Sequence, residues 1–160
     1  PYLSRGLGDV YKRQIHECAV NTIVVSTVLT INEDAFKGKS APTKLVDLFD
    51  LQKYPGRRAL QKMPQGNLEW ALIADGVKPE NVYQMLETRE GRHRAFAKLD
   101  SIKPYVVWWT TGAQPPQMLA DKEVIMASAF NGRIHSATEE EGQPFKIIWD
   151  HQLGLSLIHI

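Results

Sequence analysis

Cysteine, long apolar runs and clusters of basic residues are all scarce in this 160-residue chain. The single cysteine, Cys18, is either a buried thiol or half of a disulfide whose partner is not in the sequence, so the redox compartment stays open. The longest apolar stretch, residues 22–31, is interrupted by Ser26, Thr27 and Thr30 and is far shorter than the roughly 20 residues of a membrane-spanning helix. We therefore expect no direct insertion into a membrane.

The motifs of common metal sites and enzymes are also missing. Neither HExxH nor CxxC occurs, and the histidines before residue 155, which are His16, His93, His135 and His151, are scattered. The sequence therefore predicts no metal site. The absence of a Walker-type loop, GxGxxG and GxSxG removes the usual signatures of nucleotide cofactors and of a serine nucleophile. Glu69 and Asp75 lie six positions apart on an expected helix and face different directions. These absences indicate a protein that is not an enzyme and has no cofactor.

The two ends of the chain read as translations of the same DNA sequence, taken from opposite strands. A back-translation of residues 9–14, DVYKRQ, has a reverse complement that reads LSLIHI, which is residues 155–160. The nucleotides resemble the mosaic-end adapter of transposon-based sequencing libraries. We therefore expect residues 1–14 and 155–160 to be adapter-derived segments that add nothing to the sheet.

The charge balance changes once these ends are left out. Residues 1–14 contain three basic residues and one acidic residue, so the formal net charge changes from +1 to −1. The nearest candidate for a basic run, residues 89–94, contains a glycine and a glutamate. No stretch of the kind that follows a phosphate backbone remains, and we expect no nucleic-acid partner.

Apolar patterns and turn residues predict strands that alternate with helices. The expected strands cover residues 18–32 (a strand or a strand pair), 58–60, 105–109, 124–130 and 145–149, and the expected helices residues 43–50, 67–75, 79–91, 96–102, 115–120 and 134–141. This order predicts an α/β sheet with substantial parallel pairing. Thr43 is expected to cap the start of a helix. The strand at residues 105–109 is expected to be covered on both faces. Asn131 and Gly132 are expected to form a turn.

Aromatic and polar residues gather where two expected strands end, in WWTTGAQPPQ at residues 108–117 and in SAFNG at residues 128–132. The carboxyl ends of the strands in an open α/β sheet form the edge at which ligands bind. Trp and Phe rings offer flat faces for stacking or for a cation, and Thr, Gln and helix-start N–H groups offer directed hydrogen bonds. Because Trp108 and Trp109 lie on opposite faces of one strand, at least one of them is expected in the core.

Five segments resemble the substrate-binding proteins of polyamine-type ABC importers. They are NTIVVSTVLTINEDAF, PGRRAL, NLEWALIADGV, AFAKLDSIKPYVVWWTTGAQPPQMLA and MASAFNGRI, and they run through almost all of residues 15–154. The resemblance implies a periplasmic receptor with two α/β lobes joined by crossing hinge strands, which holds a spermidine- or putrescine-like ligand and delivers it to a membrane permease. It implies that residues 15–32 are the hinge strand region and residues 33–154 the second lobe of an incomplete type II periplasmic-binding-protein fold.

The resemblance also indicates which residues face the ligand. Phe130 matches a position for a ligand-stacking aromatic residue, and the expected ligand-binding set is Ser26, Thr27, Trp109, Thr110, Thr111, Gln114 and Phe130. Residues 63–67, MPQGN, depart from the family because they lack the carboxylates that hold ammonium groups in polyamine receptors, and an unpaired buried ammonium is costly. A receptor of different ligand specificity and a small α/β hydrolase or transferase domain therefore stay open as alternatives.

Overall fold

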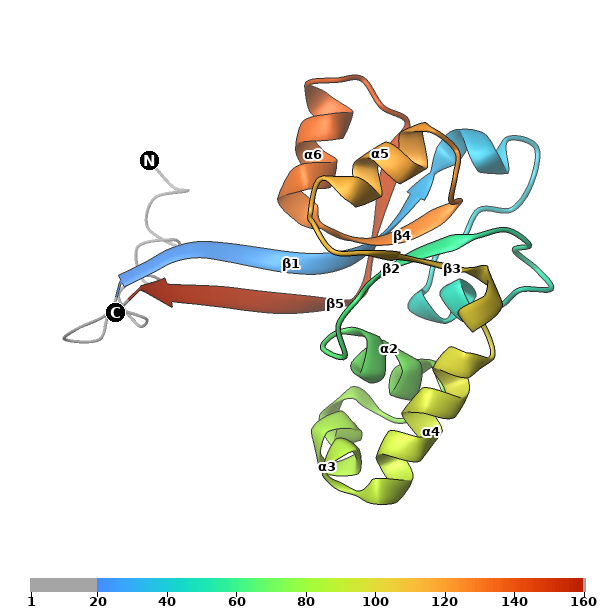
Figure 1. Cartoon of the computed structure of the whole chain (residues 1–160). Coiled ribbons are helices and arrows are strands. Elements are labelled where there is room, and N and C mark those ends of the chain that lie inside the picture. The colour runs from blue at the N-terminus through green and yellow to red at the C-terminus, as the bar shows by residue number, and fades with distance from the viewer. Residues whose placement is uncertain (1–19, 160) are drawn as a thin grey trace.

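A five-stranded mixed sheet forms the centre of the protein (Figure 1). The computed structural model describes the backbone of residues 20–159 and the side chains of residues 25–154. The sheet order is β3-β2-β4-β1-β5. The strands are β1 (Val20–Asn32), β2 (Arg58–Gln61), β3 (Val106–Trp109), β4 (Met126–Phe130) and β5 (Phe145–His159), and the α-helices are α2 (Asn67–Ala74), α3 (Val82–Glu87), α4 (Arg89–Asp100), α5 (Gln114–Ala120) and α6 (Asn131–Glu139).

Parallel and antiparallel pairing divide the sheet into two parts. β2 is parallel to both β3 and β4, whereas β1 is antiparallel to both β4 and β5. The parallel part follows from the strand–helix–strand order, because a parallel neighbour needs a crossover connection. The predicted α/β sheet with substantial parallel pairing is therefore confirmed.

Helices cover both faces of the sheet, and alternate residues of β4 show which core each face builds. Met126 packs with Leu60 and Trp70 on the face covered by α2. Ala127 packs with Trp109 and Leu119 on the face covered by α5 and α6. This period of two is what a strand buried between two helical layers requires.

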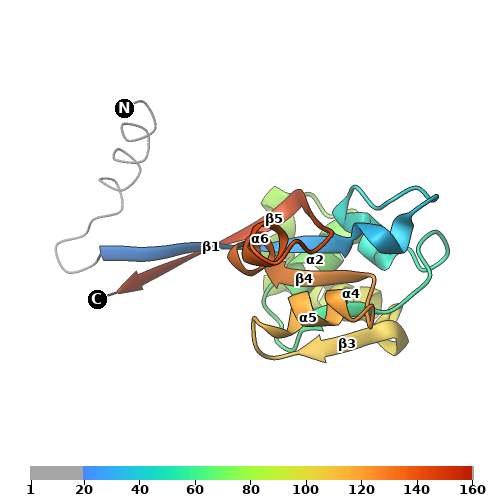
Figure 2. The same cartoon turned by 90° about the horizontal axis from the view of Figure 1, so that it is seen from above.

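A two-stranded ribbon extends away from the helical body (Figure 2). We call residues 20–25 of β1 and 154–159 of β5 the β1–β5 ribbon; its register runs from Val20 opposite His159 to Val25 opposite Leu155. The prediction that residues 155–160 add nothing to the sheet is therefore wrong for residues 155–159. The physical reason is that an unpaired strand edge offers backbone N–H and C=O groups that any extended segment can satisfy. Residues 1–14 lie outside the described residues.

Three local predictions were wrong for identifiable reasons. Thr43 caps no helix, because the Asp47 carboxylate instead accepts the N–H groups of Thr43 and Lys44 at 2.8 and 3.0 Å and opens a 3-10 helix, η2 (Leu45–Phe49). Trp108 is 40% exposed, because β3 is an edge strand beside an open groove. Asn131 begins α6 directly after β4, so no separate turn forms there.

Arg58 is the largest buried charged side chain among the described residues, with an exposed fraction of 0%. Its guanidinium donates to the carbonyl oxygens of Leu48 at 3.0 Å, Asp50 at 3.1 Å and Gly56. Burial lowers the pKa of Arg58, and the charge of Asp50 opposes that shift. The three bonds fasten the segment before β2 to the sheet.

Candidate functional site

Three parallel strands, β2, β3 and β4, end at one edge of the sheet. In Figures 1 and 2 this edge lies on the side from which the β1–β5 ribbon projects. The segments that follow these strands begin with Lys62, Thr110 and Asn131. Because ligands bind at the carboxyl edge of open α/β sheets, these loops and the root of the ribbon frame the candidate site.

Trp109 is fully buried and supports this edge from within the protein. The backbone pairing between β2 and β4 runs only as far as Ala59 and Ala127. Beyond it, the Ser128 hydroxyl accepts the backbone N–H of Gln61 at 3.2 Å and the Trp109 indole N–H at 3.1 Å. Ser128 thus joins the ends of three strands, and Trp109 serves this junction rather than presenting its ring to solvent.

Phe130 is half-buried at the end of β4. Its ring and the Trp109 indole form a T-shaped pair, with centroids 5.5 Å apart and an interplanar angle of 86°. On another side it lies so close to Gly112 that a Cβ there would be 2.8 Å from Phe130 Cδ2. Two neighbours therefore fix the orientation of this ring at the edge.

The loop after β3 is held by a single side chain. The Gln114 Oε1 atom accepts the backbone N–H groups of Thr110 at 2.7 Å and Thr111 at 2.9 Å, and the Thr110 hydroxyl donates to it at 3.4 Å. Thr110 and Thr111 are exposed and Gln114 is half-buried. Gln114 therefore shapes the loop, and the Thr111 hydroxyl is the group that the loop offers to solvent.

Ser26 and Thr27 lie at the root of the ribbon. The Ser26 backbone N–H donates to Asn131 Oδ1 at 3.0 Å, which ties β1 to the first residue of α6. Thr27 is directly opposite Phe130 in the β1–β4 register. The structure therefore brings both residues to the edge that carries Phe130.

A small cavity of about 50 Å³ opens at the same root. Of the seven predicted residues, Thr27 lines it; the other lining residues are Gln61, Met63, Gln65, Gly66, Glu69, Tyr83, Leu153 and Gly154. Sequence reasoning singled out the MPQGN segment that contributes Met63, Gln65 and Gly66. It gave no signal for Tyr83, because this residue comes from α3 and reaches the site only through the fold.

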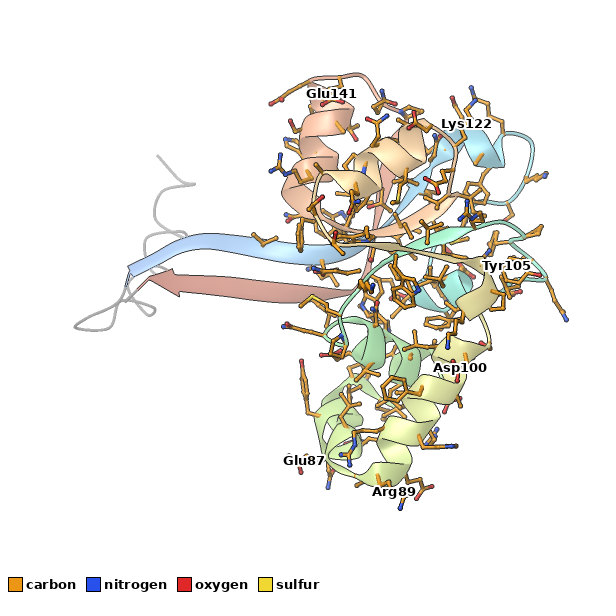
Figure 3. All side chains as sticks on the ribbon, viewed as in Figure 1. Glu87, Arg89, Asp100, Tyr105, Lys122 and Glu141 are labelled. Carbon is orange, nitrogen blue, oxygen red and sulfur yellow. The ribbon has the colours of Figure 1, made fainter. Side chains whose placement is uncertain are left out.

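A larger hollow of about 380 Å³ lies away from these residues, between α5 and α6. Its polar lining includes Gln117, Asp121, Arg133 and Glu141, and none of the seven predicted residues contributes to it. Glu141 marks this part of the molecule in Figure 3. Volume alone would select this hollow, but it does not lie at the strand ends.

The part of the chain that the structure describes has neither a cluster of metal ligands nor a membrane-spanning helix. No three His, Cys, Asp or Glu side chains there are grouped so that they could hold a metal ion. Likewise, none of the helices in residues 20–159 combines the length and the apolar character needed to cross a membrane.

The sequence profile of one family, described as bacterial extracellular solute-binding protein, matches residues 9–157. The chain belongs to this family. Bacterial extracellular solute-binding proteins are binding proteins and not enzymes, as the missing catalytic motifs indicated. The predicted resemblance is thereby confirmed at the level of bacterial solute-binding proteins, and the finer polyamine type is not.

The relatives of this solute-binding protein share its sequence over most of the chain. The gamma-aminobutyric acid-binding protein of Pseudomonas aeruginosa is 47% identical over 137 residues, which are 86% of this chain and 38% of the relative. Among solved structures, the binding protein MotA of A. tumefaciens B6 in complex with glucopine is 34% identical with a TM-score of 0.81, covering 92% of this chain and 46% of that one. The structure of a GABA receptor is 33% identical with a TM-score of 0.77, covering 92% and 43%.

The chain spans 38% of the length of the curated relative and less than half of each of these two structures. The described sheet and its helices therefore match part of a periplasmic-binding-protein fold.

Proposed function

We propose that the whole protein is a periplasmic receptor that delivers a small amine-containing solute to the permease of an ABC importer. We further infer that this solute carries both an ammonium and a carboxylate group, as γ-aminobutyric acid (GABA) does, and is not a polyamine. The observation that carries the proposal is the 47% identity to a protein named for binding GABA.

The charges at the sheet edge support an amino-acid ligand over a polyamine. A polyamine brings two or more ammonium groups, and each needs a counter-charge once water is excluded. Residues 63–67 supply no carboxylate, and the residue before them, Lys62, is a cation. A ligand with one ammonium and one carboxylate needs less negative charge from this lobe.

The start of α6 supports the same choice. α6 begins at Asn131, directly after β4, and no side chain caps its first N–H groups among the described residues. Free N–H groups at a helix start favour an anion such as a carboxylate. The half-buried ring of Phe130 precedes them and offers an apolar face to the methylene groups of a ligand.

A chimeric receptor tests the proposal. In it, the segment of this chain that matches the Pseudomonas aeruginosa relative over 137 residues replaces its counterpart there, and the unchanged relative serves as the control. The binding of GABA, putrescine and butyrate is measured by calorimetry. The dissociation constant for GABA should be micromolar or lower, which corresponds to a binding free energy of about 8 kcal/mol or more. Putrescine should bind at least tenfold more weakly than GABA. Tighter binding of putrescine than of GABA would restore the polyamine assignment. Loss of all binding in the chimeric receptor, while the parent binds GABA, would contradict the proposed function.

A further inference from the structure

Glu69 is a buried carboxylate that the proposed ligand set does not use. Its exposed fraction is 7%, and it lines the 50 Å³ cavity at the root of the ribbon. One oxygen, Oε2, accepts the Gly66 backbone N–H at 2.7 Å and closes the start of α2. Within the described residues the Glu69 carboxylate forms no other hydrogen bond, and no Lys, Arg or His nitrogen lies within 4.0 Å of its oxygens.

The Glu69 carboxylate has one backbone donor, and its second oxygen is open to the water of the cavity that a ligand would displace. Burial of an ionised carboxylate is costly unless hydrogen bonds and an opposite charge offset the loss of water. The start of α2 supplies part of that compensation through its N–H groups. The second oxygen is left to bind whatever enters the cavity.

The remaining cavity wall suits an ammonium group. Gln61 and Gln65 bring amide oxygens, Thr27 a hydroxyl and Tyr83 a phenol ring. Amide and hydroxyl oxygens accept hydrogen bonds from an ammonium, and an aromatic face attracts a cation. A cavity needs roughly 10–15 Å³ to hold one water molecule, so the volume of about 50 Å³ leaves room for an ammonium group.

We propose that Glu69 is the specificity-determining counter-charge for the ammonium end of the ligand, which enters the cavity at the root of the ribbon. The assignment rests on the proposed function. The body of the ligand then leads from the cavity toward Phe130, which is opposite Thr27 in the sheet. A trimethylated ammonium has no N–H to donate to the Glu69 carboxylate, so the site discriminates against it.

The variant Glu69→Gln in the chimeric receptor separates charge from structure. A glutamine oxygen can still accept the Gly66 N–H, so the start of α2 is kept while the negative charge is lost. The exposed Glu87 at the end of α3, remote from the ribbon in Figure 3, provides the matched control Glu87→Gln. Circular dichroism melting of both variants should give midpoints within about 3 °C of the parent chimeric receptor.

Calorimetry with three ligands then tests the assignment. GABA should bind Glu69→Gln at least 20-fold more weakly, whereas butyrate, which lacks the ammonium, should change by less than threefold. The unchanged chimeric receptor should bind GABA at least tenfold more tightly than its trimethylammonium analogue, γ-butyrobetaine. Equal GABA affinity in Glu69→Gln and Glu87→Gln, or an equal loss for GABA and butyrate, would overturn the role of Glu69 and leave the receptor function standing. A chimeric receptor that binds none of the three ligands would overturn both.

Discussion

Removing the Ser128 hydroxyl should destabilise the protein more than any surface serine does. The side chain is 2% exposed, and its oxygen accepts from the Gln61 backbone N–H and from the Trp109 indole N–H. Ser128→Ala leaves both donors without their acceptor. A buried donor left unpaired costs about 1–3 kcal/mol, and the Gln61 N–H should cost the lower amount because this residue is half-buried. With both donors unpaired, the free energy of unfolding should fall by about 2–4 kcal/mol.

Urea unfolding of the 160-residue chain, followed by far-ultraviolet circular dichroism, measures this loss. The midpoint should fall by about 1–2 M at unchanged slope. The exposed Ser101, whose hydroxyl donates to the Lys98 carbonyl oxygen, gives the control Ser101→Ala with a change below about 0.5 kcal/mol. In a Trp109→Phe background, which lacks the indole N–H, Ser128→Ala should cost about 1 kcal/mol less. Equal stabilities of Ser128→Ala and Ser101→Ala would refute the three-strand junction.

Three further changes have defined outcomes. Gly112→Ala should weaken GABA binding by the chimeric receptor about tenfold, because the new Cβ displaces the Phe130 ring. The control Gly132→Ala, whose Cβ has no heavy atom within 4 Å, should change the affinity less than twofold. Equal affinities of the two variants would show that the ring position is unimportant. Phe130→Ala should weaken ligand binding by about 1–3 kcal/mol in calorimetry through lost burial and stacking, and an unchanged affinity would remove Phe130 from the site. Arg58→Ala should lower the free energy of unfolding by about 3 kcal/mol or more in urea titrations, since three carbonyl acceptors lose their donor, and a loss below about 1 kcal/mol would contradict its anchoring role.

Local patterns predicted the elements whose formation depends on local sequence. The strand at β2, the helix at α2 and the strand at β4 were expected within a few residues of their observed bounds, because apolar spacing and turn residues are local signals. Which of Trp108 and Trp109 is buried was not decidable, since a period of two separates the faces without saying which face is covered. The cap by Asp47 was missed because a preceding threonine gives the stronger sequence signal.

The site was predictable only in part. The edge itself followed from the order of strands and helices, and the structure brings Thr27, Thr111 and Phe130 to that edge. Their role in ligand binding stays a prediction. Glu69 and Tyr83 were not assigned to it, because their approach to Thr27 depends on how α2 and α3 pack beside the ribbon. Distances between separate elements are not encoded in the spacing of residues along the chain.

A ligand-bound crystal structure of the chimeric receptor tests the central claim most directly. We predict that GABA lies at the carboxyl edge of β2 and β4, with its methylene groups against Phe130 and its ammonium nitrogen within about 3.2 Å of a Glu69 oxygen. Density for the ligand in the hollow between α5 and α6, with Phe130 free of contact, would contradict the account.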